Sequence, residues 1–216
     1  FQRYRPAGLK GNGNMIRNAN TDAPHLEGRY DCCVVGAGPA GMTVALQLAE
    51  AGKRVLLLEG GDREYTPESQ ELYEGELLGR DYDPLDAPRL RYLGGTTGHW
   101  GGRCLLLDPV DFEARDHVPL SGWPIGYNDL AGYQAGAARL LRTGEFRNRR
   151  SPASFSDTLE HVEQRWSTDR PFHEITNEEP VRFGTTFFKT LEGSDAIDTV
   201  LNANLTSLAV DSAPDG

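Results

Sequence analysis

The sequence predicts an α/β fold with a Rossmann-like parallel β-sheet, and three observations near its start predict it. Residues 30–38, YDCCVVGAG, form a short apolar run that ends in glycines, as a buried strand before a tight turn does. Residues 39–52 follow with apolar side chains at helical spacing, and residues 53–61, KRVLLLEGG, form a second apolar run. A strand, a helix and a strand within about 30 residues make a βαβ unit, in which the two strands are parallel.

The turn before the predicted helix carries the pattern G-x-G-x-x-G at Gly36, Gly38 and Gly41. The first glycine permits the tight turn, the second lets a pyrophosphate approach the backbone, and the third allows close contact between helix and strand. Glu59 ends the second strand, where its carboxylate can accept hydrogen bonds from both hydroxyls of an adenosine ribose and would repel a 2′-phosphate. The pattern predicts a dinucleotide site that takes NAD or FAD and disfavours NADP.

Residues 91–104, RYLGGTTGHWGGRC, form a second glycine-rich loop. A nicotinamide site needs no such loop, whereas the longer flavin cofactor needs another segment to hold it, so the loop favours FAD. Gly94 and Gly95 would bring backbone N–H groups to the cofactor, and the two threonines from Thr96 on would offer hydroxyls. His99 fits a structural loop histidine, a hydrogen-bonding neighbour of the flavin, or a nucleophile that attaches to it covalently.

The remaining sequence predicts shorter elements joined by polar segments. Helices are expected at residues 68–78, from about residue 128, at 156–166 and at 185–194, and one strand, or two with a break, at 198–211. The predicted parts are an extended or mobile N-terminal arm (1–28), the first segments of the FAD-binding domain (29–109), part of an α+β substrate domain with a helical insert (110–190), and a return to the FAD-binding domain (191–216). The final Asp-Gly indicates a hairpin turn, from which we expect the chain to be the N-terminal piece of a longer protein.

Composition argues against several kinds of partner. The chain has 216 residues and a net charge of −10, whereas nucleic acids and anionic membranes favour basic patches. No apolar run reaches the roughly 20 residues that span a bilayer, and no signal peptide is visible, so we expect no membrane span and a cytoplasmic protein. Cys32, Cys33 and Cys104 lack metal-binding spacing, and no metal site is expected.

On these residues the chain resembles the N-terminal part of the glucose–methanol–choline (GMC) oxidoreductases. The resemblance rests on residues 31–61, on YLGGTTGHWGGRCLLLDPVDF at 92–112, and on SGWPIGYNDLAGYQ at 121–134, with a further fit at 182–211. The GHWGG form is similar to the branch of pyranose 2-oxidases, bacterial glycoside 3-oxidases and sugar dehydrogenases.

This resemblance implies FAD, and oxidation of a CH–OH group to a carbonyl by hydride transfer to flavin N5. It implies a small-molecule alcohol substrate, a sugar or glycoside, and dioxygen or a quinone as electron acceptor. The catalytic histidine pair would lie in a C-terminal portion or a companion chain, so no catalytic residue is expected here. His99 lies where some members attach FAD covalently and others bind it reversibly. The residues implied to line the cofactor are Gly36, Gly38, Pro39, Ala40, Glu59, Gly60, Gly94, Gly95, Thr96, Gly98, His99, Trp100 and Leu205.

Two other functions stay open on the sequence. An NAD-dependent dehydrogenase explains the first glycine pattern and Glu59, but it leaves the second glycine-rich loop without a role. A truncated, non-catalytic dinucleotide-binding subunit explains the chain end without a further portion.

Overall fold

The structure, a computed structural model, describes residues 16–21, 30–102, 104, 107, 109–142 and 180–208. The chain divides into a first unit, Phe1–His99 with Arg182–Gly216, and a second unit, Trp100–Val181. The sequence placed the corresponding boundaries after residues 109 and 190. The first unit therefore takes in residues 182–190, which the sequence assigned to the substrate side.

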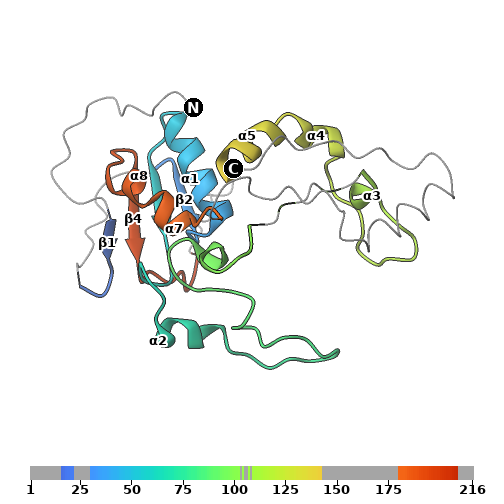
Figure 1. Ribbon diagram of the computed structural model, residues 1–216, viewed down its shortest axis with the longest axis horizontal. Coiled ribbons are helices and arrows are strands. Elements are labelled where there is room, and N and C mark those ends of the chain that lie inside the picture. The colour runs from blue at the N-terminus through green and yellow to red at the C-terminus, as the bar shows by residue number, and fades with distance from the viewer. Residues whose placement is uncertain are drawn as a thin grey trace, which may run out of the picture. The chain divides into compact units, whose positions relative to one another are not determined.

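A four-stranded parallel sheet forms the first unit's core (Figure 1). Its strands lie in the order β1-β4-β3-β2 and are β1 (Ile16–Asn18), β2 (Cys32–Val35), β3 (Val55–Leu58) and β4 (Ile197–Leu201). All three strand pairs are parallel, so the carboxyl ends of the strands meet at one edge of the sheet. The α/β fold with a parallel sheet is confirmed.

Strand β1 lies within the segment that the sequence predicts as an extended or mobile arm. Ile16 pairs with Thr199, and Asn18 pairs with Leu201, which makes β1 an edge strand of the sheet. A β-strand is extended backbone, so residues 16–18 fit the extended form of the predicted arm. A strand of three residues with a single apolar side chain is too short to show a hydrophobic period.

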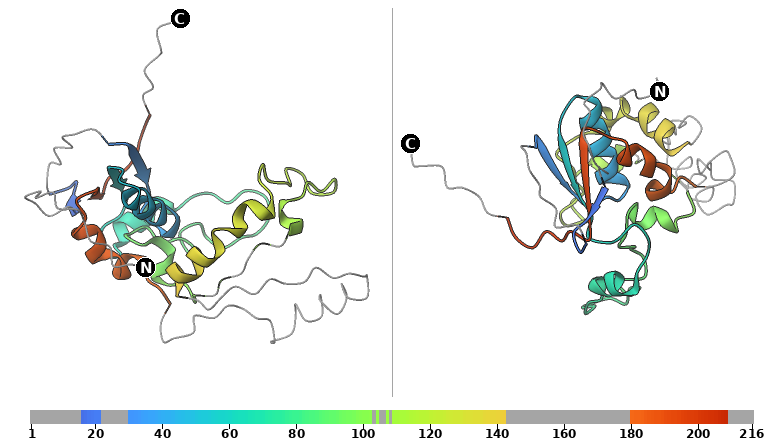
Figure 2. Two further views of the ribbon diagram at one scale, coloured as in Figure 1. Left: turned by 90° about the horizontal axis from the view of Figure 1, so that it is seen from above. Right: turned by 90° about the vertical axis from the view of Figure 1, so that its left-hand side faces the viewer.

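Helix α1 (Pro39–Glu50) connects β2 to β3 and packs against both strands. Figure 2 shows this helix beside the sheet. Proline suits the first helical position because that position needs no N–H donor. The side chains of Met42, Ala45 and Ala49 are buried, as the helical spacing predicts. The helix ends before Gly52, whose φ of +76° lies in the left-handed region.

The two faces of β2 differ in burial. Val34 is buried on the face that α1 covers, whereas Cys33 and Val35 point to the other face and are exposed. Strand β3, which lies between β2 and β4, is buried along Val55, Leu56 and Leu57. The core of the first unit therefore lies between the central strands and α1.

Several predicted elements of the first unit are shorter than the sequence suggests. The helix expected at 68–78 is α2 (Pro67–Gln70) followed by the 3₁₀ helix η1 (Glu71–Tyr73). The helix expected at 185–194 is two pieces, α7 (Phe183–Thr186) and α8 (Phe188–Glu192), separated at Phe187. Of the strand or strands expected at 198–211, β4 ends at Leu201, where Asn202 follows with a left-handed φ of +56°, and residues 209–211 lie outside the described part of the chain.

The described residues of the second unit form short helices joined by turns and irregular segments. The unit contains α3 (Pro109–Phe112), α4 (Tyr127–Ala131) and α5 (Gln134–Leu141), so the helix expected from about residue 128 is interrupted at residues 132–133. The helix expected at 156–166 lies outside the described residues. Across the part of the chain that the structure describes, no helix combines the length and the apolar character needed to cross a bilayer.

Candidate cofactor site

The first glycine loop, residues 36–41, leads from the carboxyl end of β2 into α1. Gly36 has a φ of +96°, and its N–H donates to the carbonyl oxygen of Leu58 at 2.7 Å. A Cβ at residue 41 would overlap the carbonyl oxygen of Gly36 and would lie 3.2 Å from Val34 Cγ1. Gly36 therefore shapes the turn, and Gly41 permits the helix to approach the strand.

Gly38 has a different environment from Gly41. It is the N-cap of α1, and a Cβ built on it would meet no atom within 4 Å. No side chain caps the N–H groups of the first turn of α1, and that turn carries no acidic residue. A helix N-terminus with uncapped N–H groups and open space beside it fits a bound diphosphate group. The site therefore suits the diphosphate of a dinucleotide cofactor.

The carboxylate of Glu59 ties the first glycine loop to the end of β3. Its Oε2 accepts the Ala37 N–H at 2.8 Å, and its Oε1 accepts the Gly61 N–H at 2.9 Å. The residue is 6% exposed. Each carboxylate oxygen has about two acceptor positions, so one on each oxygen stays available for a ribose hydroxyl.

The second glycine loop, residues 94–98, lies directly against the first glycine loop. The Gly94 N–H donates to the carbonyl oxygen of Ala37 at 2.9 Å. A Cβ at residue 95 would come within 3.2 Å of Gly38 Cα. Two segments that the sequence assigned separately to one cofactor are thus adjacent in the fold.

The two threonines of the second glycine loop hold the loop itself. Thr97 is buried, and its hydroxyl donates to the Gly94 carbonyl oxygen at 2.6 Å while accepting the Phe183 N–H at 3.1 Å. The Thr96 hydroxyl accepts the Leu90 N–H at 3.3 Å. Thr97 therefore anchors the loop to α7 in this structure.

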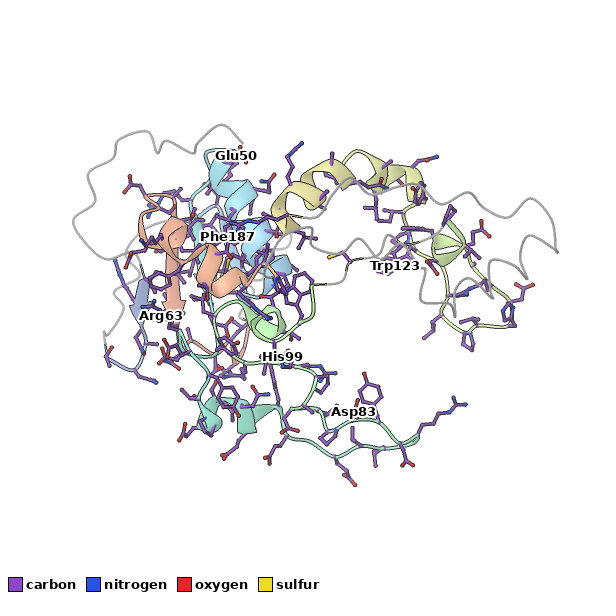
Figure 3. The ribbon with its side chains drawn as sticks, in the orientation of Figure 1. Glu50, Arg63, Asp83, His99, Trp123 and Phe187 are labelled. Carbon is purple, nitrogen blue, oxygen red and sulfur yellow. The ribbon has the colours of Figure 1, made fainter. Side chains whose placement is uncertain are left out.

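His99 follows the 3₁₀ helix η2 (Gly95–Gly98) and is labelled in Figure 3. Its side chain is exposed, and its backbone N–H donates to the Thr96 carbonyl oxygen at 3.2 Å. A Cβ on Gly98 would overlap the Tyr92 hydroxyl, so the Tyr92 side chain packs directly on the loop there. Trp100 begins the second unit, where its Nε1 donates to the Val181 carbonyl oxygen at 3.0 Å.

The chain after β4 approaches the turn that presents Glu59. The Ala203 N–H donates to the Glu59 carbonyl oxygen at 2.9 Å, and the Asn202 N–H donates to the Gly61 carbonyl oxygen at 2.9 Å. Leu205 lies two residues further on and is 46% exposed. The structure therefore brings the segment that contains Leu205 to the Glu59 turn.

Pro39 and Ala40 form the start of α1, beside Gly38. Gly60 lies in the turn after β3, where a Cβ would overlap the guanidinium group of Arg91. Among the described residues, no group of histidine, cysteine or acidic side chains could hold a metal ion.

Arg91 is a residue that sequence reasoning missed. Its guanidinium group donates to the Gly60 carbonyl oxygen at 2.7 Å, to Ser69 Oγ at 2.6 Å and to Asn204 Oδ1. It also lies 5.8 Å from the ring centroid of Tyr73. No sequence signal predicts these contacts, because they join segments that are distant along the chain; only the neighbouring second glycine loop draws attention to the position.

A polar cluster occupies the same edge of the sheet, beyond β1, β3 and β4. The Asn202 amide donates to Asp62 Oδ2 at 2.8 Å and to Asn18 Oδ1 at 3.0 Å. The hydrogen bond from Asn202 lowers the pKa of Asp62, with further lowering from the Arg63 N–H and from Asn18. This cluster fixes β1 to the edge of the sheet where the glycine loops lie.

Comparisons with known proteins agree with this geometry. Residues 31–66 match the model of a family described as FAD binding domain. The chain is 35% identical over 124 residues to a 2-methyl-1,2-propanediol dehydrogenase of Mycolicibacterium austroafricanum, which covers 48% of this chain and 22% of that protein. It is 30% identical over 134 residues to an opine oxidase component of Agrobacterium tumefaciens (strain Ach5), which covers 56% of this chain and 24% of that protein.

A crystal structure of pyridoxine 4-oxidase from Mesorbium loti is similar with a TM-score of 0.46 and 18% sequence identity, over 81% of this chain and 42% of that chain. The chain therefore spans less than a quarter of the two relatives and less than half of the solved structure.

The segment that matches the FAD binding domain contains the first glycine loop, α1, β3 and Glu59. That segment holds the uncapped start of α1 and the buried Glu59 carboxylate. FAD is therefore the cofactor of this site.

Proposed function

We propose that the protein is an FAD-dependent oxidoreductase that oxidises a CH–OH group to a carbonyl. The observation that carries the proposal is the junction of the two glycine loops at the carboxyl edge of the sheet, with Glu59 beside it and open space at Gly38. The propanediol dehydrogenase to which the chain is similar acts, by its name, on an alcohol. The resemblance to GMC oxidoreductases supports the same reaction class.

Each part of the junction has a distinct role toward the cofactor. The first turn of α1, with Gly38, Pro39 and Ala40, would hold the diphosphate through backbone N–H groups. Glu59 would accept the ribose hydroxyls, because each of its carboxylate oxygens accepts one backbone N–H and keeps a second acceptor position. Leu205 would lie near the adenine, since the segment after β4 reaches that turn.

The second glycine loop would hold the rest of the cofactor. Gly94 and Gly95 lie against the first loop, and Thr96, Gly98 and His99 continue away from it. The bound flavin would supply the hydride acceptor for alcohol oxidation. The resemblance to GMC oxidoreductases assigns the flavin lining to Trp100 as well.

The proposal extends to the substrate and the electron acceptor. We infer a sugar or glycoside from the GHWGG form of the second loop, with dioxygen or a quinone as electron acceptor. The catalytic histidine pair would be supplied by a C-terminal portion of the protein or by a companion chain. The NAD-dependent alternative has less support, because the matched family binds FAD and the second loop packs on the first.

The test is anaerobic reduction of the full-length flavoprotein. Free sugars, glycosides, short aliphatic diols and opine-type secondary amines are added separately, and bleaching of the flavin absorbance is followed. The proposal predicts bleaching by a sugar or glycoside. Bleaching by a diol alone would remove the carbohydrate substrate and keep alcohol oxidation, whereas bleaching by amines alone would contradict the reaction class.

A further inference from the structure

Arg91 connects the turn beside Glu59 to two other segments of the first unit. The acceptors of its guanidinium group lie after β3 (Gly60), in α2 (Ser69) and after β4 (Asn204). These acceptors are uncharged, and among the residues that the structure describes no carboxylate forms an ion pair with Arg91. A planar guanidinium with several fixed donors can bridge separate acceptors, which a lysine ammonium on a flexible stem does less well.

The backbone of Arg91 is held as firmly as its side chain. Its N–H donates to Gln70 Oε1 at 3.0 Å, and its carbonyl oxygen accepts the Ser69 hydroxyl at 3.2 Å. The Gln70 amide in turn donates to the carbonyl oxygens of Asp86 and Arg89, both at 2.6 Å. The guanidinium group is therefore presented from a fixed point.

The turn after β3 is built around this arginine. A Cβ on Gly60 would overlap the Arg91 guanidinium, and a Cβ on Gly61 would overlap the Arg91 carbonyl oxygen. The Gly61 N–H is one of the two donors that orient the Glu59 carboxylate. Arg91 thus holds the turn after β3 through Gly60, while Glu59 bonds to the first glycine loop through Ala37.

We propose that Arg91 is the positioning residue of the adenosine end of the FAD site. It would hold the Glu59 turn and the segment from Asn202 to Leu205 at a fixed separation, so that both present their groups to the ribose and the adenine. This inference rests on the proposed function. It assigns Arg91 no contact with the cofactor and no part in the reaction.

The position predicts an effect confined to one end of the cofactor. ADP contains the adenine, ribose and diphosphate, whereas FMN contains the flavin and a single phosphate. Arg91→Met removes the donors and keeps an unbranched apolar stem. We expect this variant to weaken ADP binding about tenfold or more, because the Glu59 turn and the segment after β4 lose their common support, and to leave FMN binding unchanged.

The experiment measures the dissociation constants of ADP, FMN and FAD for the deflavinated full-length protein by titration calorimetry. Arg91→Lys keeps the charge and should recover part of the ADP affinity. Arg89→Met is the matched control, because Arg89 is exposed two residues away and bonds to Gln70 through its backbone carbonyl oxygen, which the substitution keeps. Asn204→Ala removes a single exposed acceptor and should weaken ADP binding in the same direction if Arg91→Met does not fold.

Selective loss of ADP affinity in Arg91→Met, with Arg89→Met unchanged, supports the assignment. Equal loss of ADP and FMN affinity would indicate a general structural role and overturn it, as would unchanged ADP binding. A wild-type protein that binds neither ADP nor FAD would overturn the proposed function instead, so the two failures are distinguishable.

Discussion

At the scale of single residues, the glycines of the first glycine loop serve two different purposes. Gly41 has backbone atoms in the space that a Cβ would need, so its role is packing. Gly38 has open space there and a φ of −71°, which any residue can adopt, so nothing in the fold itself requires glycine. The difference separates a folding requirement from a binding requirement.

The first prediction follows from this difference. Gly38→Ala should change the free energy of unfolding of the apoprotein by no more than about 1 kcal/mol, because the new methyl group meets no atom and the backbone is unstrained. The same methyl group occupies the space assigned to the diphosphate, so flavin content should fall to near zero. Denaturant unfolding and the flavin absorbance of the purified protein measure the two effects.

Gly41→Ala is the matched control for Gly38→Ala. Its Cβ overlaps the Gly36 carbonyl oxygen, so it should destabilise the apoprotein by at least about 1–3 kcal/mol, the usual cost of overpacking. If Gly38→Ala keeps its flavin, the diphosphate does not lie at the start of α1.

The sequence predicts some residues of the site better than others. Gly36, Gly38 and Glu59 belong to a local pattern whose chemistry is readable within one βαβ unit. Ala37 and Arg91 are not predictable in this way, because Ala37 joins Glu59 to Gly94 and Arg91 joins three segments only once the chain is folded. Residues whose role is a tertiary contact leave no local signal.

At the scale of elements, the second glycine loop depends on α7. The buried Thr97 hydroxyl is the acceptor for the Phe183 N–H, and Arg182 donates to the Thr97 carbonyl oxygen at 2.9 Å. A Cβ on Gly184 would overlap the Leu93 carbonyl oxygen, which shows how closely α7 approaches the loop. The residues after position 180 therefore support the cofactor site from the other end of the chain.

The second prediction tests this support. Thr97→Val keeps the side-chain shape and leaves the buried Phe183 N–H without its acceptor, so unfolding should become easier by about 1–3 kcal/mol. FAD should also dissociate faster, because the second loop is no longer pinned. Denaturant unfolding and the rate of flavin release measure these two effects. Thr97→Ser keeps the hydroxyl and should restore most of the stability and most of the flavin retention. Unchanged stability in Thr97→Val would show that α7 does not support the loop.

A hydrogen bond near the amino ends of the strands gives the third prediction. The Tyr30 hydroxyl donates to Asp198 Oδ2 at 2.6 Å, and Arg54 lies 3.8 Å from the same carboxylate. Burial, followed by the hydrogen bond to Asp198, raises the pKa of Tyr30 to about 12. The folded protein therefore keeps the phenol proton at pH values where the unfolded chain has lost it.

The stabilisation from Tyr30 is fully present below pH 10, the ordinary tyrosine pKa, and is lost as the pH rises toward 12. The difference in unfolding free energy between the wild type and Tyr30→Phe should shrink over this interval. Urea unfolding at a series of alkaline pH values measures it. A difference that stays constant across the interval would contradict the hydrogen bond from Tyr30 to Asp198.

Some element boundaries cannot be predicted from the apolar pattern of the sequence. The strands β2 and β3 were predictable from their continuous apolar runs, and the helix α1 from apolar residues at helical spacing. The helix expected at 185–194 divides at Phe187, where the backbone leaves helical geometry while Phe183 and Leu191 are both buried. Continuous apolar spacing cannot reveal such a break, since tertiary packing satisfies both pieces.

At the scale of the whole molecule, β2 ends the described part of the sheet. Parallel sheets are normally covered on both faces, yet the side chains of Cys33 and Val35 are exposed. An edge strand with an exposed apolar face favours association between chains.

The fourth prediction is that the 216-residue chain, produced alone, self-associates as its concentration rises. Val35→Lys should reduce this association, because a charge on an edge strand opposes pairing. Light scattering across a concentration series follows it. Val44→Lys, at an exposed position on α1, is the control and should leave the association of the wild type in place. A chain that stays monomeric throughout would show that this edge is not adhesive.

We expect FAD to bind where the two glycine loops meet. The most direct measurement is the absorption spectrum of the purified full-length protein, taken with an intact mass of the same sample under denaturing conditions. We expect a flavin band. A chain mass increased by FAD would mean covalent attachment, for which His99 is the prime candidate, and a bare mass would mean reversible binding. A protein without a flavin band that binds NADH in a titration would contradict the account.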